Sequence, residues 1–257
     1  MEIIKVVLRS LWRVWFYVVG GIIIIILLPV LIILTSHEKL YPIFYKLARM
    51  WAKVVIFLMG FKVKVTGDNK IESGKSYMFS ANHTSMIDVF VMLSVVKSPL
   101  VFVGKQELIK LPIFGFFYKR TCILVDRSNP ESRKNVYLSA QRKLKRGYSV
   151  CIFPEGMVPA DERIVLSDFK NGVFSLSLEH QIPIVPMIFY DCKKRFSYTI
   201  NSGSPGILRV KFMDIIETKN LSLEDKDIIR EKMFNLMYQE LITDIENQQI
   251  KNENKTN

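Results

Sequence analysis

The sequence predicts an α/β layered domain that follows membrane-anchoring helices at the N-terminus. The first observation is a long N-terminal run without any charged side chain, which predicts the membrane-anchoring helices. The second is that, after Gly60, short runs rich in β-branched and aromatic residues alternate with helical runs, as in layered α/β domains. The third is that a chain of 257 residues, 49% of them hydrophobic, can fill one sizeable core beside such an appendage.

Residues 14–36 are uncharged and predict a membrane segment. As a helix rising ~1.5 Å per residue, this run would measure ~34 Å, against a hydrocarbon core of ~30 Å. A cleaved signal peptide would have a shorter apolar region of ~7–15 residues, with small residues at its cleavage site. The entry of the run carries the basic and aromatic residues of a membrane interface, namely Lys5, Arg9, Arg13, Trp12, Trp15 and Tyr17.

Residues 41–59 predict a second helix, in which Lys46, Arg49 and Lys53 share one face. This pattern suits a helix lying in the membrane interface, and it is also compatible with an ordinary helix that packs on the core. Basic residues flank the first segment on both sides, so the sequence does not separate a full crossing from a hairpin in one leaflet. The apolar face of this helix comprises Ile43, Phe44, Leu47, Trp51, Val54 and Phe57.

The rest of the chain predicts one globular domain over 61–250, after membrane-anchoring helices over 1–60 and before a disordered polar tail over 251–257. Each expected strand is short and bounded by turn residues. The expected strands are 61–66, 77–81, 100–103, 122–125, 149–153, 184–189 and 208–213. The expected helices are 87–96, 130–146, 171–180 and 222–247.

The formal charge of +12 predicts an anionic partner, either nucleic acid or lipid. The uncharged N-terminal run favours membrane lipids, and no nucleic-acid partner is expected. Cys122, Cys151 and Cys192 are odd in number and form no C-x-x-C pattern, which predicts a reducing compartment without disulfides. We therefore expect the domain on the cytoplasmic face of the cell (inner) membrane. Three scattered histidines predict no metal site.

His83 and Asp88 form a candidate general base with its orienting carboxylate. Five steps along a helix separate two side chains by about 140°, so the pair requires a turn between a strand and a helix. The expected strand at 77–81 and helix at 87–96 provide that turn. The pattern Ser85-x-x-Asp88 is also compatible with a capping box that only starts the helix.

Four reactive residues each follow an expected strand: His83, Lys105, Arg127 and Glu155. In α/β sheets, functional side chains gather in the loops beyond the strand ends. The sequence therefore predicts that one cleft collects these residues. The segment 108–118, with three phenylalanines, predicts an apolar wall able to admit an acyl chain, or plain core packing.

Four ordered blocks carry a resemblance to a known family. They are residues 82–88, 125–127, 153–156 with 169–172, and 182–186. Together they resemble the phospholipid acyltransferase family that includes 1-acyl-sn-glycerol-3-phosphate acyltransferase. The resemblance covers roughly residues 75–190, and the order of the blocks makes it more specific than any single block. It implies a glycerolphosphate-acyltransferase-like αβα domain with a mixed sheet.

The resemblance implies transfer of a fatty acyl group from acyl-CoA or acyl carrier protein to the free sn-2 hydroxyl of lysophosphatidic acid, giving phosphatidic acid. His83 would take the hydroxyl proton as the oxygen attacks the thioester, and Asp88 would fix the imidazole tautomer. No covalent acyl-enzyme and no cofactor beyond the acyl donor are needed. Other readings are a different lyso-lipid acceptor, such as a lyso-aminolipid, or a catalytically silent lipid-binding protein.

By the same resemblance, Arg127, Glu155 and Gly156 help to form the acceptor site, and the position of Lys105 after a strand suggests a further cation for the phosphate. The family usually continues Glu-Gly with Thr-Arg-Ser, whereas this chain has Met-Val-Pro at 157–159. The usual arginine is missing. Either Arg163 or Lys170 would then supply the lost charge, or the acceptor is not a simple phosphate monoester.

Overall fold

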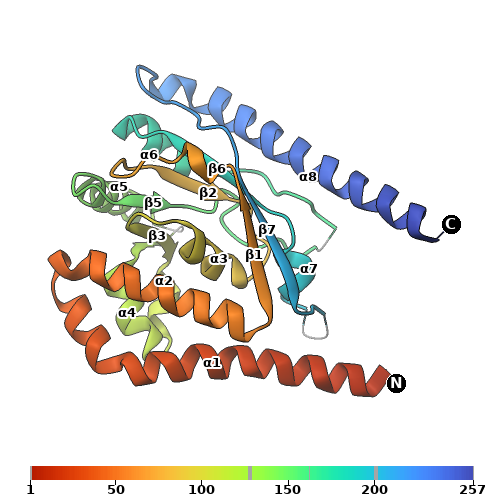
Figure 1. Cartoon of the computed structure of the whole chain (residues 1–257). Helices are drawn as coiled ribbons and strands as arrows, with labels where there is room; N and C mark the ends of the chain where they lie inside the picture. Colours follow the sequence, from red (N-terminus) through yellow and green to blue (C-terminus); the bar gives the residue numbers. More distant parts are fainter. Residues whose placement is uncertain (1, 127–128, 162, 200–201, 257) are drawn as a thin grey trace.

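The structure is a computed structural model of the whole chain, and it describes residues 2–126, 129–161, 163–199 and 202–256 (Figure 1). Helices and strands alternate along most of it. The α-helices are α1 (Glu2–Ser36), α2 (Tyr41–Leu58), α3 (Ile87–Val95), α4 (Phe114–Thr121), α5 (Pro130–Leu144), α6 (Gly172–His180), α7 (Cys192–Phe196) and α8 (Lys226–Thr256). The strands are β1 (Phe61–Thr66), β2 (Met78–Ala81), β3 (Leu100–Lys105), β4 (Ile123–Val125), β5 (Ser149–Cys151), β6 (Ile184–Phe189) and β7 (Gly206–Phe212).

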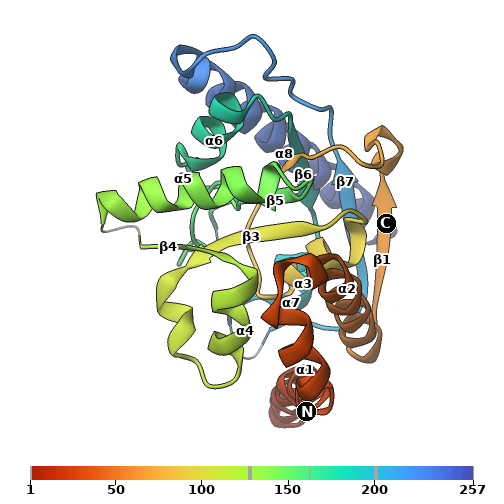
Figure 2. The same cartoon turned by 90° about the vertical axis from the view of Figure 1, so that its left-hand side faces the viewer.

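The strands form one seven-stranded sheet in the order β1-β7-β6-β2-β5-β3-β4. Neighbours run parallel except β6 and β7, which are antiparallel. Helices α5, α6 and α8 cover one face of the sheet, and α3 with α2 covers the other (Figures 1 and 2). The α/β layered fold with a mixed sheet, predicted from the alternation of patterns and from the family resemblance, is confirmed.

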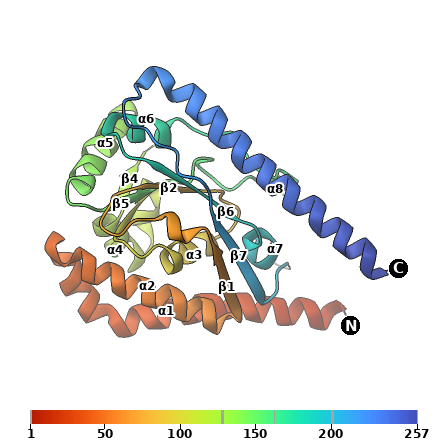
Figure 3. The same ribbon diagram turned by 45° about the horizontal axis from the view of Figure 1, so that its top comes forward.

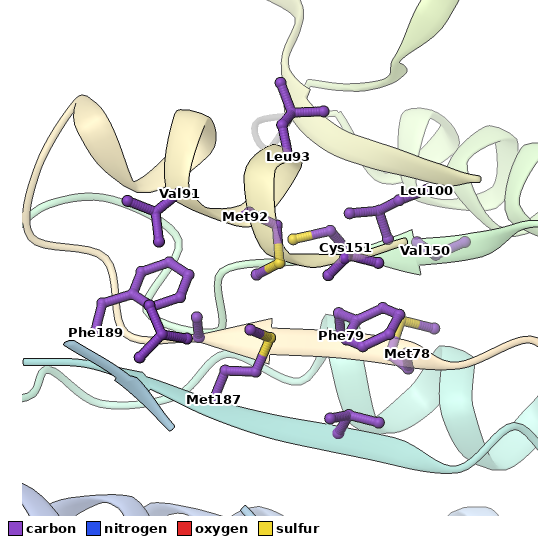
Figure 4. Close-up of a cluster of buried hydrophobic side chains, with 14 of the residues drawn as sticks. Met78, Phe79, Val91, Met92, Leu93, Leu100, Val150, Cys151, Met187 and Phe189 are labelled. Atoms are coloured by element: carbon purple, nitrogen blue, oxygen red, sulfur yellow. The ribbon is translucent and has the colours of Figure 1, made fainter. Parts of the chain in front are cut away.

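The centre of the sheet is buried and largely apolar. All residues of β2 and β6 are buried, and the one polar side chain among them, that of Ser80, donates to the Ile152 carbonyl. Side chains from β2, β5 and α3 meet above the sheet, among them Phe79, Met92 and Val150 (Figure 4). The amide of Asn82 then joins the end of β2 to β6 through two hydrogen bonds, donating to the Phe189 carbonyl (3.1 Å) and accepting from its backbone N–H (2.8 Å).

Helix α1 begins at Glu2, well before the uncharged run at 14–36. Within the described residues it is the one helix long and apolar enough to cross a membrane. Only 11% of its most apolar stretch is buried against the protein. Three tryptophans tie α1 to α2: Trp12 donates to the Met59 carbonyl, Trp15 to that of Leu58, and Trp51 to that of Gly20.

Helix α2 combines the two alternatives that the sequence leaves open. One row of its side chains packs on the globular domain. In this row the buried Tyr41 and Tyr45 hydroxyls donate to the carbonyls of Leu100 (2.7 Å) and Val96 (3.1 Å). A second apolar row, which includes Phe57, is exposed. The exposed row lies on the same two-helix unit as the apolar surface of α1, as expected for a helix at a membrane interface.

Three parts of the chain differ from the predicted elements. Short helices α4 and α7 occupy segments for which no element was predicted, because helices of five to eight residues give little periodicity. Helix α8 extends to Thr256, through most of the segment 251–257 that was expected to be a disordered tail. No Gly or Pro interrupts that segment, and α8 projects beyond the sheet (Figure 3).

Candidate active site

His83 lies in the turn between β2 and α3, as predicted, with its side chain 19% exposed. Its Nδ1 atom is 2.9 Å from Oδ2 of Asp88, a side chain that is fully buried. A carboxylate accepts hydrogen bonds, so Nδ1 carries the proton and Nε2 keeps a lone pair. The ring also stacks on Phe153, with centroids 4.2 Å apart, which restricts its rotation.

Asp88 is held by more than the histidine. The same Oδ2 atom accepts hydrogen bonds from the backbone N–H groups of Thr84 (2.7 Å) and Ser85 (2.8 Å) at the start of α3. Backbone donors at a helix N-terminus stabilise a carboxylate in its charged form. The capping role that the sequence left as an alternative therefore coexists with the orienting role, and the carboxylate presents a fixed acceptor to the imidazole.

Cys192, at the start of α7, borders this pair from the other side. Burial, and then the negative charge of Asp88, hold the pKa of the Cys192 thiol well above its usual value. The Cys192 side chain is therefore a neutral thiol beside the Asp88 carboxylate. Ser85 connects the same region to α7, because its hydroxyl donates to the Phe196 carbonyl and accepts from the Ile87 backbone N–H.

Glu155 is buried, with 2% of its surface exposed, and both of its oxygens accept backbone hydrogen bonds. Oε1 accepts from the N–H of His83 (2.6 Å) and Oε2 from that of Ser167 (2.9 Å). Burial raises the pKa of the Glu155 carboxyl, and the two backbone donors partly offset this. The residue thus joins the turn that carries the histidine to the loop at 153–167. Sequence spacing does not reveal a hydrogen bond between residues that are 72 positions apart.

We expect Glu155→Gln to lower the free energy of unfolding by about 1–3 kcal/mol, because the amide nitrogen cannot accept from a backbone N–H and leaves one buried donor unpaired. The value of kcat should fall as well, since the His83 backbone loses an anchor. Chemical denaturation and steady-state kinetics measure the two effects. Glu246→Gln, an exposed change on α8, is the control and should alter neither quantity. Unchanged stability and unchanged kcat in the Glu155 variant would refute this role.

A cavity of about 2580 Å³ opens beside the His83 ring. Much of its lining is apolar and comes from α1, α2, α3 and α4. The expected apolar wall at 108–118 contributes Leu108, Leu111, Phe114, Phe117 and Tyr118. Four lysines also line the cavity, namely Lys105, Lys134, Lys170 and Lys193.

The structure brings most of the predicted site residues to this cavity. Lys105, at the end of β3, and Gly156 line it with His83 and Glu155. Arg127 lies outside the described residues. Of the two candidates for the missing arginine, Lys170 lines the cavity, whereas Arg163 pairs with Asp161 and is 90% exposed. Lys134 and Lys193 were not predicted, because lysines are common in a chain with this charge.

The described part of the chain contains no group of three or more His, Cys, Asp or Glu side chains that could hold a metal ion. The chemistry available to the described residues is a proton acceptor at Nε2, a fixed buried carboxylate behind it, and cations near the same cavity. This set can take a proton from a hydroxyl group and hold an anionic group nearby.

Comparison with known proteins gives one family. A family model described as Acyltransferase matches residues 62–190. The chloroplastic 1-acyl-sn-glycerol-3-phosphate acyltransferase of Arabidopsis thaliana is 27% identical over 84% of this chain. The 1-acyl-sn-glycerol-3-phosphate acyltransferases of Saccharomyces cerevisiae (27%) and Mus musculus (alpha form, 28%) match 72% and 77% of the chain. The chain spans 60% of the Arabidopsis protein, 62% of the yeast protein and 71% of the mouse protein.

Among solved structures, the crystal structure of the 1-acyl-sn-glycerophosphate acyltransferase from Thermotoga maritima has the same fold. Its TM-score is 0.76 at 20% sequence identity, with 95% of this chain and 97% of that chain covered.

Proposed function

Because this chain belongs to the acyltransferase family, we propose that it transfers a fatty acyl group from acyl-CoA or acyl carrier protein to the free sn-2 hydroxyl of 1-acyl-sn-glycerol-3-phosphate, giving phosphatidic acid. The observation that carries the proposal is the 2.9 Å contact between His83 Nδ1 and Asp88 Oδ2 at the wall of the large cavity. The relatives that share this family are 1-acyl-sn-glycerol-3-phosphate acyltransferases.

In the proposed reaction, Nε2 of His83 takes the proton of the lipid hydroxyl while the hydroxyl oxygen attacks the thioester carbonyl carbon. The Asp88 carboxylate stabilises the imidazolium that forms. The C–S bond then breaks, the proton passes from the imidazolium to the departing sulfur, and an ester and a free thiol result. Thiols are far better leaving groups than alkoxides, so no second strong acid is required.

The shape and polarity of the cavity match the two substrates. Its apolar lining, which includes Phe117 and Tyr118 on α4, suits a fatty acyl chain. Lys105 and Lys170 are our candidates for the acceptor phosphate, with Arg127 from the family resemblance. Glu155 has both oxygens on backbone N–H groups, so we assign it a positioning role in place of the acceptor contact that the resemblance implied.

We propose that α1 anchors the enzyme in the cell (inner) membrane and that the catalytic domain lies on the cytoplasmic face of this membrane. Support comes from the long apolar α1 and from the three cysteines, which are all free. An anchored domain meets its lipid substrate at the membrane surface, which is where a lysophospholipid with one acyl chain resides.

A panel of acceptors tests the proposed substrate. Purified full-length protein is given acyl-CoA or acyl carrier protein together with lysophosphatidic acid, lysophosphatidylethanolamine, lysophosphatidylcholine or a lyso-aminolipid. We expect the highest kcat/KM with lysophosphatidic acid. The one observation that favours another acceptor is the stretch 157–159, where exposed Met157 lines the cavity and the usual arginine is missing. Product from another lyso-lipid, with none from lysophosphatidic acid, would select that alternative.

Neutralising the phosphate cations should act on acceptor binding. Loss of one charge-assisted hydrogen bond costs about 1.5–3 kcal/mol, so we expect Lys170→Ala or Lys105→Ala to raise the KM for lysophosphatidic acid about 10-fold to 100-fold. The KM for the acyl donor should change less. Lys232→Ala, an exposed change on α8, is the matched control. A KM for lysophosphatidic acid that stays at the control value in both cavity variants would exclude these lysines from phosphate binding.

A further inference from the structure

The segment between β3 and β4 has several large apolar side chains that are partly exposed. It consists of the short 3-10 helix η3 (Gln106–Lys110), a tight turn, and α4. We call its exposed apolar residues the η3–α4 tip; their exposed fractions run from 38% to 48%. The tip comprises Leu108, Leu111, Ile113, Phe114 and Phe116. A contiguous exposed patch of this kind marks an interaction surface.

We infer that the η3–α4 tip is a second membrane-contacting surface, separate from α1, which inserts into the bilayer interface beside the cavity. The first argument is charge. Residues 105–120 contain the cations Lys105, Lys110, Lys119 and Arg120 and a single acid, Glu107. Apolar side chains rimmed by Lys and Arg are typical of segments that lie in a membrane interface. Cations placed next to an anionic lipid surface strengthen the attachment of such a segment.

The second argument is position. Helix α4 contacts α1, and both lie on the side of the sheet opposite α5, α6 and α8 (Figure 2). The tip is therefore part of a segment that packs against α1, the helix with the apolar, exposed surface expected of a membrane anchor. A protein that binds a bilayer through α1 brings α4 to the same surface. The bilayer is the one partner that α1 itself already implies.

The third argument is that the tip reaches from the cavity wall to the outer surface of the protein. Phe117 and Tyr118 are buried and line the cavity. Leu108, Leu111 and Phe114 line the cavity and are also partly exposed, whereas Ile113 and Phe116 are exposed and are not part of its wall. Placing the outer face in lipid brings the cavity next to the acyl chains, while the guanidinium of Arg120, 3.5 Å from the Phe116 ring centroid, stays at the headgroup level.

The backbone of the tip is strained at Ile113. This residue has φ 59° and ψ −57°, a conformation that a β-branched residue rarely adopts. The Phe114 N–H donates to the Pro112 carbonyl across this turn. Behind it, Gly115 packs so closely that an added Cβ would lie 2.0 Å from the Ile109 carbonyl oxygen. The turn is thus held in one tightly packed shape, with Ile113 at its exposed end.

Depth-dependent quenching tests the inference without relying on enzyme activity. In a Cys122→Ser background, Phe116→Cys is labelled with an environment-sensitive fluorophore, since Cys151 and Cys192 are buried. The full-length protein is reconstituted into vesicles of phosphatidylcholine and phosphatidylglycerol that contain doxyl-labelled lipids. Ile228→Cys, on the exposed surface of α8, is the matched control. We expect blue-shifted, strongly quenched emission from position 116 and aqueous, unquenched emission from position 228.

Equal, aqueous emission from both positions would overturn the inference. The inference would also be overturned if the emission of the probe at position 116 did not change with vesicles but changed on addition of acyl carrier protein, because the tip would then be a protein-docking surface. If the proposed acyl transfer itself failed, the quenching result would still decide this question.

A second test measures enzyme activity, and it rests on the proposed function. The double variant Ile113→Asp, Phe116→Asp should lose about 10-fold in kcat/KM with vesicle-held acceptor. It should stay within about 2-fold of the native protein with detergent-dispersed acceptor, because neither residue lines the cavity. Ile228→Asp is the control and should change neither rate. Equal losses in both assays, with unfolding unchanged, would contradict a role in membrane contact.

Discussion

Replacement of His83 by alanine is expected to reduce kcat for acyl transfer by about 10³-fold, within the 10²–10⁴ range of a lost general base. Among the residues that the structure describes, the His83 imidazole is the proton acceptor that lies both at the cavity wall and against a buried carboxylate. Substrate affinity should change little, because the acyl chain and the phosphate contact other residues. Steady-state kinetics with lysophosphatidic acid and acyl-CoA provide the measurement.

His37→Ala serves as the control for the His83 variant, because His37 lies outside the cavity, between α1 and α2. It should leave kcat near the native value. A His83 variant with native kcat would remove the imidazole from the reaction, whatever its effect on KM. A rise in KM with unchanged kcat would show that the ring only helps to bind substrate.

Asp88→Asn is the second large effect, with an expected loss of about 10³–10⁴-fold in kcat, as for the buried aspartate of a Ser-His-Asp triad. With its oxygen at the Oδ2 position, the amide keeps the hydrogen bonds but has no negative charge to stabilise the imidazolium. With its nitrogen there, it donates to Nδ1, the ring proton moves to Nε2, and the two backbone N–H groups lose their acceptor. The Asp88 oxygen also accepts from two backbone N–H groups at the start of α3, so some stability should be lost with the activity.

The two effects of Asp88→Asn are separable by measuring the pH dependence of kcat and the free energy of unfolding on the same samples. Asp161→Asn, on the rim of the cavity, is a matched control of the same chemistry at an exposed position. If the Asp88 variant were folded, destabilised and fully active, the carboxylate would have only the capping role. If it were inactive only because it had unfolded, circular dichroism would show it directly.

The parts of the fold that sequence predicts well are those in which one local pattern decides the structure. The strand 184–189 was predicted with the bounds of β6, because its unbroken apolar run is compatible only with a buried strand between turns. The pairing of His83 with Asp88 also follows from local order, since both residues belong to one strand-turn-helix unit. The start of α1 at Glu2 was not predicted, because the bounds of the predicted membrane segment come from the absence of charged residues and not from helix propensity.

The parts that sequence does not predict depend on contacts between distant segments. The role of Glu155 arises from a bond to a backbone N–H 72 residues earlier in the chain, and the resemblance alone suggested a substrate contact. Lys170 could be separated from Arg163 only when the cavity was known, because both are basic residues in the same loop region. For the segment 108–118, composition predicted an apolar wall for an acyl chain or plain core packing, and the exposure of part of it depends on how distant segments pack.

The central claim is that the acyl group passes directly from the thioester to a lipid hydroxyl, with His83 as the general base. The most direct test uses a labelled acyl donor and follows thiol release and lipid product in the same reaction. We expect native protein to release thiol only when lysophosphatidic acid is present, in an amount equal to the phosphatidic acid formed and without label on the protein. We expect His83→Ala to release thiol and to form phosphatidic acid far more slowly. Thiol release without acceptor, label retained on the protein, or native rates in His83→Ala would contradict it.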